Sequence, residues 1–124
     1  MMRETGNKIV DLSFAFALEI ISFSEELEKN HKYAIAKQLI RSGTSIGANI
    51  YESQNCESRA DFIHKLKIAV KEAEETEYWL LLCKHSETYP YKESILEQLK
   101  QIQKLLSSII YSTKQNMSKI KLAN

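Results

Sequence analysis

The sequence has few residues that turn a chain, with one proline and three glycines among 124 residues. Because these two residue types dominate tight turns, their scarcity favours a small number of long elements. The sequence also lacks any apolar run near the roughly 20 residues that a membrane-spanning helix needs. We therefore expect a soluble protein with no membrane partner.

Cysteine is scarce as well. Cys56 and Cys83 lie far apart, and neither has a second ligand at metal-binding spacing. His31 and His85 also lack a partner one helical turn away. No apolar segment suited to export precedes the first helical pattern. We expect reduced thiols, a cytoplasmic location, and no bound metal or cofactor.

Acidic residues are missing from the last part of the chain. Residues 1–97 carry 12 basic and 16 acidic side chains, whereas residues 98–124 carry five lysines and no acid. The formal net charge is only +1, which argues against strong binding of a polyanion. The lysines are typical of a solvated helix face, and the alternative is a surface that touches phosphates.

Apolar residues recur with helical spacing in four segments separated by short polar breaks. We predict helices over residues 8–29, 32–54, 59–86 and 91–115, with Pro90 opening the fourth and the residues from about Gln115 fraying. Short connections make consecutive helices antiparallel. The prediction is one all-α domain over residues 1–124, an antiparallel up-down-up-down four-helix bundle. Its inward positions are Ile9, Leu12, Phe16, Ile20, Phe23 and Leu27, then Ile35, Leu39, Ile46 and Ile50, then Phe62, Leu66, Ala69, Ala73, Thr76, Leu80 and Cys83, and finally Ile95, Leu99, Ile102, Leu106 and Ile109.

The first helix carries more apolar surface than one bundle core requires. Beside the inward stripe, a second series at the same spacing comprises Val10, Phe14, Ala17 and Ile21. The three other helices of the same chain cannot cover both stripes. We therefore predict that the second stripe is an interface between identical chains, and that the protein is a homo-oligomer.

The middle of the second helix is unusual. Residues 42–47 are poor helix formers, and each glycine costs a helix roughly 1 kcal/mol relative to alanine, so the segment could be a loop. The apolar phase nevertheless continues through Ile46 and Ile50, and Gly43 and Gly47 lie one turn apart. We predict an unbroken helix whose two glycines let another backbone approach closely.

A polar stripe borders the core along the same helix, at the helical spacing of Gln38, Arg41, Ser45, Asn49 and Glu52. We predict that Arg41 reaches Glu75 or Glu77 on the third helix, within a chain or across an interface. We also expect Asn49 to bond to exposed backbone. The alternative is a polar face that is merely solvated. Trp79 is expected to fill a core or subunit contact.

Two further groups of residues suggest contact with nucleic acid. A basic surface could form once copies are arranged around an axis, from Lys65, Lys67, Lys71, Lys100, Lys104 and Lys114. Arg59 and His64 have a spacing that resembles the catalytic pair of a helical ribonuclease superfamily that needs no metal. The arginine could stabilise phosphorane charge while the histidine moves a proton. However, residues five apart in a helix point roughly 140° apart.

Three motifs in the second and third predicted helices carry a family resemblance. They are Gln38-Leu39-Ile40-Arg41, Ser45-Ile46-Gly47-Ala48-Asn49-Ile50-x-Glu52 and Ser58-Arg59-x-x-Phe62-x-x-x-Leu66-x-Ile68-Ala69. With these motifs and a Glu-x-Glu at Glu75 and Glu77, the chain resembles the 23S rRNA intervening-sequence protein family over nearly its whole length. Gly47 stands where the family usually has proline, and Ser53 where it usually has glycine. A straighter or looser middle of the second helix would follow.

The resemblance implies a fold, an assembly and a class of function. It implies an antiparallel four-helix bundle that forms a ring-shaped homopentamer with a role that is not firmly defined. The family is similar to the accessory subunit of diversity-generating retroelements, a pentamer that binds a reverse transcriptase and has a basic surface. The chain is thus expected to be a non-catalytic scaffold, with RNA, DNA or a nucleic-acid enzyme as its partner. The alternatives are a metal-independent ribonuclease and a pure protein–protein adaptor.

Overall fold

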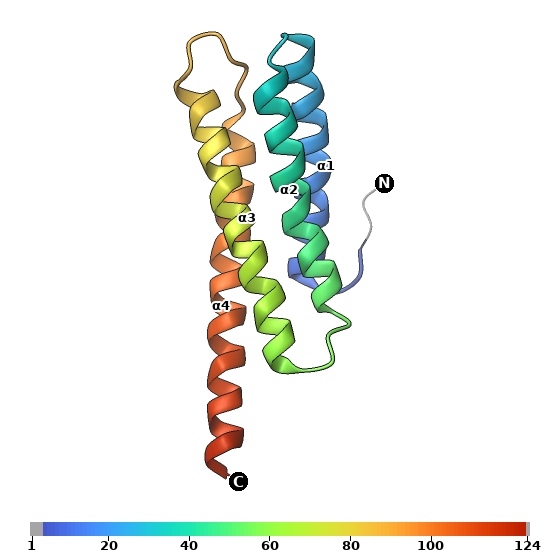
Figure 1. Ribbon diagram of the computed structural model, residues 1–124, viewed down its shortest axis with the longest axis vertical. Helices are drawn as coiled ribbons and strands as arrows, with labels where there is room; N and C mark the ends of the chain where they lie inside the picture. Colours follow the sequence, from blue (N-terminus) through green and yellow to red (C-terminus); the bar gives the residue numbers. More distant parts are fainter. Residues whose placement is uncertain (1–3, 124) are drawn as a thin grey trace.

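The computed structural model describes residues 4–123, which form four α-helices: α1 (Lys8–Lys29), α2 (Tyr33–Ser53), α3 (Arg59–His85) and α4 (Glu93–Ala123). Consecutive helices run in opposite directions (Figure 1). Each of α1 and α3 packs against both α2 and α4, so the four helices close into a four-sided bundle. The predicted all-α antiparallel four-helix bundle is confirmed.

Local sequence explains where the helices begin and end. The side chain of Asn7 accepts a hydrogen bond from the Val10 backbone N–H (3.5 Å), and Ser58 Oγ accepts one from the Asp61 N–H (3.1 Å). These caps satisfy N–H groups that have no partner inside α1 and α3. His31 turns the chain between α1 and α2 with a positive φ of 62°. Pro90 does not open α4, which begins at Glu93 after Tyr91 has packed against the core.

The core contains most of the positions that the apolar spacing predicts. Leu12, Ile35, Phe62 and Ile109 are the exceptions, because they are only partly buried. At the start of α3 the buried residue is Ile63, which is 7% exposed, in place of Phe62, and from Leu66 onward the buried residues of α3 are the predicted ones. The buried apolar residues other than Ile63 form a single cluster that all four helices share.

The contact between α1 and α2 depends on Gly43 and Gly47. A Cβ atom at position 43 would lie 2.8 Å from Cγ2 of Ile20, and one at position 47 would lie 3.2 Å from the carbonyl oxygen of Ser13. Both distances are shorter than ordinary van der Waals contact. The prediction of an unbroken helix with two glycines at a close helix contact is confirmed.

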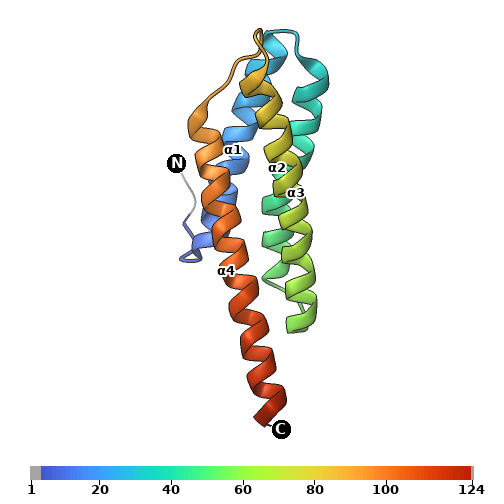
Figure 2. The ribbon, with the colours of Figure 1, turned by 90° about the vertical axis from the view of Figure 1, so that its left-hand side faces the viewer.

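The prediction that the chain frays from about Gln115 is wrong, because α4 continues to Ala123. At 31 residues it is longer than the 27-residue α3 and extends past the ends of the other helices (Figures 1 and 2). The segment contains lysine, glutamine, methionine, leucine and alanine, which favour helix, and no glycine or proline. The half-buried Met117 also lines a hollow with Ala60 and Ile63 of α3. Within residues 4–123, no helix has an apolar stretch long enough to cross a bilayer.

Candidate functional site

The second apolar stripe of α1 borders a groove between α1 and α2, which we call the α1–α2 groove. Its volume is about 400 Å³. Of the four predicted interface residues, Val10, Phe14 and Ala17 line the groove, whereas Ile21 is 38% exposed further along the helix. The full lining consists of Thr5, Val10, Asp11, Ser13, Phe14, Ala17, Thr44, Gly47, Ala48, Tyr51 and Glu52.

The α1–α2 groove is hollow because its α2 wall is made of small residues. Gly47 and Ala48 present little or no side chain opposite Phe14 and Ala17. Phe14 therefore stays 40% exposed, and Leu18 beside it stays 45% exposed. Adjacent exposed apolar residues on one helix face are typical of a surface that another molecule covers.

The acidic residues of the α1–α2 groove are partly engaged within the chain. Thr5 donates hydrogen bonds to the Asp11 carboxylate from its backbone N–H (3.0 Å) and from its hydroxyl (2.8 Å). Lys65 of α3 forms an ion pair with Glu52 at 3.0 Å. Because both carboxylates have partners, the surface that remains for another molecule is mainly apolar.

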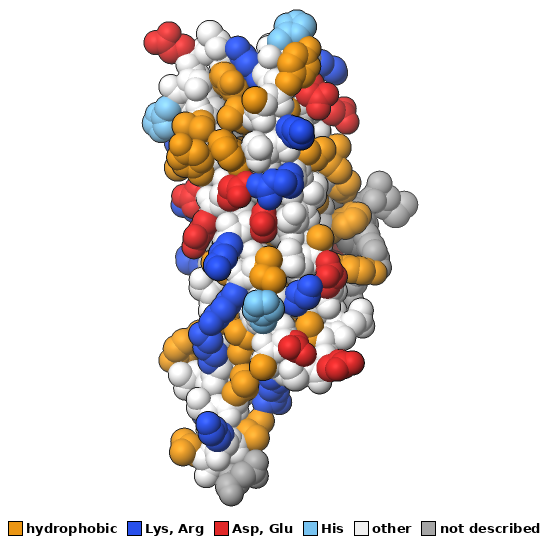
Figure 3. All heavy atoms as spheres, viewed as in Figure 1, with side chains coloured by type: hydrophobic (Ala, Val, Ile, Leu, Met, Phe, Trp, Pro, Cys, Tyr) orange, Lys and Arg blue, Asp and Glu red, His pale blue; other side chains and the backbone are white. Residues whose placement is uncertain are grey.

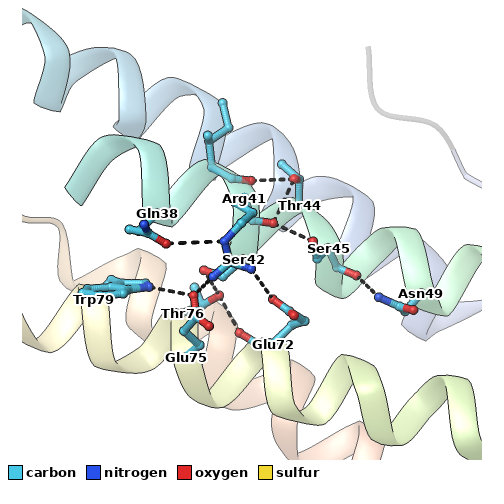
Figure 4. Close-up of polar contacts among 11 residues, drawn as sticks. Gln38, Arg41, Ser42, Thr44, Ser45, Asn49, Glu72, Glu75, Thr76 and Trp79 are labelled. Carbon is cyan, nitrogen blue, oxygen red and sulfur yellow. Dashed lines mark hydrogen bonds and ion pairs between the residues drawn. The ribbon is translucent and has the colours of Figure 1, made fainter. Parts of the chain in front are cut away.

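The polar stripe of α2 forms a network with α3 (Figure 4). Arg41 of α2 reaches between two carboxylates of α3, forming one ion pair with Glu75 and another with Glu72 at 3.3 Å. The indole Nε1–H of Trp79, which is partly buried against the core, donates to Glu75 at 3.0 Å. Arg41 thus lies within hydrogen-bonding reach of the predicted Glu75 and of a second acid that sequence reasoning missed.

The rest of the stripe bonds mainly within α2. Arg41 Nε donates to the side chain of Gln38 (3.4 Å), Ser45 Oγ donates to the Arg41 carbonyl (2.6 Å), and the Asn49 amide donates to the Ser45 carbonyl (2.8 Å). Glu52 pairs with Lys65 across the α2–α3 contact. The side chain of Arg41 is 49% exposed in the single chain, so its ion pairs are half solvated.

Glu77 does not join this network. Residues two apart in a helix lie about 200° apart, so Glu77 faces α4 while Glu75 faces α2. Hydrogen bonds from Lys100, followed by those from Gln103, lower the pKa of Glu77. Helical spacing also identifies Glu72 as a partner for Arg41, because Glu72 lies three residues before Glu75 and shares its face.

The predicted basic surface separates into paired and unpaired lysines. Lys65 and Lys100 are neutralised by Glu52 and Glu77. Lys67, Lys71 and Lys114 instead line one hollow between α3 and α4, which also includes Glu74 and Tyr111. Lys104 is exposed on α4 outside that lining. Figure 3 shows lysine and arginine side chains gathered over the lower part of α3 and α4.

Two of the unpaired lysines, Lys67 and Lys114, repel each other. Hydrogen-bonding contact with the Lys67 side chain and the positive charge of that group lower the pKa of Lys114. No ion pair within residues 4–123 involves Lys67, Lys71 or Lys114, and Glu74 is the acidic residue in the lining of their hollow. An anion between these lysines would relieve the repulsion.

The geometry does not support catalysis by Arg59 and His64. Both are exposed on α3, and in the described part of the chain neither side chain takes part in a hydrogen bond or ion pair. A general base needs a group that orients it within hydrogen-bonding reach. Across residues 4–123, no three histidine, cysteine, aspartate or glutamate side chains gather in a way that would hold a metal.

Comparison with known proteins identifies the family. The family model for the 23S rRNA-intervening sequence protein matches residues 5–108. The chain belongs to this family. A solved structure from Bacteroides thetaiotaomicron, described as a protein of unknown function from the S23 ribosomal protein family, is 48% identical. The alignment covers 82% of this chain and 97% of that one, with a TM-score of 0.78. No curated protein matches this chain.

Membership of the 23S rRNA-intervening sequence protein family confirms the resemblance seen in the motifs of the second and third helices. The match includes all of α1, α2 and α3 but ends at residue 108, within α4. Tyr111, Lys114 and the rest of the α4 extension therefore lie outside the matched region. The α1–α2 groove and the Arg41 network lie inside it.

Proposed function

We propose that this chain is a non-catalytic subunit of a homo-oligomeric scaffold, which assembles through the α1–α2 groove and the apolar face of α1 beside it. The observation that supports this proposal is the exposure of Phe14, Leu18 and Ile21 on one face of a helix whose other face fills the core. A second copy of the chain is the occupant we propose for this surface.

The size of the interface can be bounded from these side chains. Full burial of a large apolar side chain contributes about 1.5–3 kcal/mol, and these three are already more than half buried, so each would add about 1 kcal/mol. Association costs at least about 4 kcal/mol in lost rigid-body freedom. The contact must therefore extend beyond these residues along the α1–α2 face, toward the roughly 800 Å² per partner of a stable interface.

The assembly we propose is a ring of five chains. Five copies of a 14.3-kDa chain would give about 72 kDa. Phe14→Glu places a charge in the groove and is expected to shift the protein to monomer in size-exclusion chromatography. The matched control is Leu122→Glu, because Leu122 is 87% exposed on the end of α4. A Phe14→Glu variant that stays folded and elutes with the wild type would refute this interface.

Nucleic acid, or an enzyme that acts on it, is the partner class that we propose for the scaffold. The supporting observation is the group of unpaired lysines at positions 67, 71 and 114. Repetition of this group around a ring would strengthen a weak site. Filter binding of RNA and DNA over a salt series tests it, since affinity should fall steeply as salt rises. Absence of binding at low salt would indicate a pure protein adaptor instead.

The enzyme alternative has a direct test. Labelled RNA is incubated with the wild type and with His64→Ala, and the products are separated by size. We expect no cleavage by either protein. Cleavage by the wild type that is lost in His64→Ala would establish the ribonuclease alternative and refute the non-catalytic role.

A further inference from the structure

We infer that the seam between α3 and the C-terminal half of α4 binds single-stranded nucleic acid, with lysines along the seam holding phosphates and Tyr111 stacking on a base. This inference rests on the nucleic-acid part of the proposed function. It specifies the form of the ligand and the residues that distinguish it from a duplex.

Three hollows along this seam share walls and form a continuous track. The first, of about 500 Å³, is lined by Lys67, Lys71, Tyr111 and Lys114. Lys114 also lines the second hollow, together with Lys121, and Lys121 lines the third. Arg59 also lines the third hollow. Each hollow is thus joined to the next by a shared lysine.

The track has the charge that a phosphate backbone needs. Its five basic residues are Arg59, Lys67, Lys71, Lys114 and Lys121, and within residues 4–123 none of them pairs with an acid. The acidic residue in its lining is Glu74, beside Lys71 at one end. The crowding of Lys67 against Lys114 indicates positive charge without a counterion.

The length of the track fits a polymer rather than a single phosphate. Lys71 and Arg59 are 12 residues apart on α3, which at 1.5 Å per residue is about 18 Å. A stacked strand advances 3.4 Å per nucleotide, so the track spans about five phosphates of one strand. A lone anion would occupy only one of the three hollows.

The aromatic and apolar side chains that line the track suit the unpaired bases of a single strand. Tyr111 is 66% exposed and lies in the same hollow as Lys67, Lys71 and Lys114. Val70 and Ile110 line that hollow as well, and Met117 lines the next two. Proteins that bind single strands combine a basic groove with aromatic side chains on which bases stack. A duplex hides the faces of its bases and cannot use Tyr111 in this way.

The track depends on the end of α4. Tyr111, Lys114, Met117 and Lys121 all lie beyond residue 108, where the family match stops. Without this extension, the hollow beside Lys67 and Lys71 would keep only Ser107 of its α4 lining. The extension therefore gives this chain a surface that the matched region alone does not form.

The inference is tested by fluorescence anisotropy at about 50 mM salt with the full chain. The probes are a labelled 12-nucleotide oligo-U RNA, an oligo-dT of the same length, and a 12-base-pair DNA duplex. We expect at least one of the two single strands to bind at least about tenfold more tightly than the duplex. A comparison of oligo-U with oligo-dT then shows whether the site prefers RNA or single-stranded DNA. Tyr111→Ala should weaken that binding by about 5- to 150-fold, which is the loss of one stacked base, while Tyr111→Phe should retain it.

Controls separate the seam from general charge and from folding. The double variant Lys67→Gln, Lys114→Gln should reduce the salt dependence of the binding affinity by about two counterions. The control is the double variant Lys29→Gln, Lys37→Gln, at the opposite end of the bundle from Lys114, which should change that salt dependence less. Tyr33→Ala removes a tyrosine of α2 that is 59% exposed, close to the exposure of Tyr111, and should have no effect. Equal affinity for duplex and single strand, or unchanged binding by Tyr111→Ala, would overturn the inference and leave nucleic-acid binding standing. Absence of binding to all three probes would overturn both.

Discussion

The hydroxyl oxygens of Thr76 and Ser42 lie 2.9 Å apart and share a hydrogen bond in the α2–α3 contact, where both side chains are fully buried. Thr76 Oγ1 also lies 2.7 Å from the Glu72 carbonyl oxygen, so its one hydroxyl proton has two acceptors within reach. A buried hydroxyl without a partner costs about 1–3 kcal/mol. This pair therefore favours the one rotation of α2 and α3 at which the two hydroxyls meet, which is also the rotation that places Arg41 beside Glu72.

Removal of one of these two hydroxyls should destabilise the fold. We expect Thr76→Val to lower the free energy of unfolding by about 1–3 kcal/mol, because it leaves the Ser42 hydroxyl buried without its partner. Ser42→Ala with Thr76→Val should cost less than the sum of the two single changes. Urea denaturation measures both. Thr113→Val is the control, since among residues 4–123 the Thr113 hydroxyl bonds to the Ile109 carbonyl of its own helix and to no other helix. Simple additivity would show that the hydroxyls do not interact.

The close approach of α1 and α2 predicts an unusual sign for a glycine substitution. In an exposed helix, Gly→Ala stabilises by about 1 kcal/mol. Gly43→Ala should instead destabilise by about 1–3 kcal/mol, because the new methyl group would overlap the side chain of Ile20. Gly47→Ala should be milder, since its nearest atom is 3.2 Å away. Thermal unfolding of both variants decides this, and a raised melting temperature for Gly43→Ala would contradict the packing described.

The Arg41 network predicts a link between the α2 stripe and assembly. In the single chain the half-exposed ion pairs should contribute at most about 1 kcal/mol, because water screens them. Arg41→Ala also leaves the Glu72 and Glu75 carboxylates one turn apart without the cation between them, and their repulsion should disturb the α2–α3 contact that holds α2 in place beside the proposed α1–α2 interface. We expect a small loss of stability together with weakened assembly, measured by melting temperature and sedimentation velocity. Lys37→Ala, on the same helix, is the control. If Arg41→Ala matches Lys37→Ala in both melting temperature and sedimentation, the polar stripe of α2 is merely solvated and has no role in assembly.

Glu77 predicts a contribution of pH to stability. Its pKa is lowered in the folded protein from an ordinary value of 4.5, chiefly by the hydrogen bond from Lys100. The unfolded chain therefore takes up the proton more readily, so the stabilisation is present above about pH 4.5 and is lost as the pH falls through the folded pKa. Glu77→Gln should flatten the dependence of unfolding free energy on pH below about pH 5. Lys100→Gln should have a similar effect, and unchanged curves for both variants would exclude this pair as a source of acid sensitivity.

Helical periodicity was sufficient to predict the fold and much of the site, because it places residues around each helix axis. It put Phe14 outside the core and Arg41 on the face that meets Glu75. The errors arose where that rule was not followed through. The sequence prediction groups Glu77 with Glu75 and Lys65 with Lys67, but residues two apart in a helix face different neighbours. The end of α4 was expected to fray because of its place in the chain, although Met117 borders α3. The grooves themselves depend on contacts between helices, which no single periodicity describes.

The mass of the wild-type protein tests the central claim, that identical chains cover the exposed face of α1. Light scattering coupled to size exclusion, over a dilution series into the micromolar range, would measure it. We predict a single species of about 72 kDa, five times the 14.3-kDa chain, that persists on dilution. A monodisperse 14.3-kDa species throughout the series would contradict the claim.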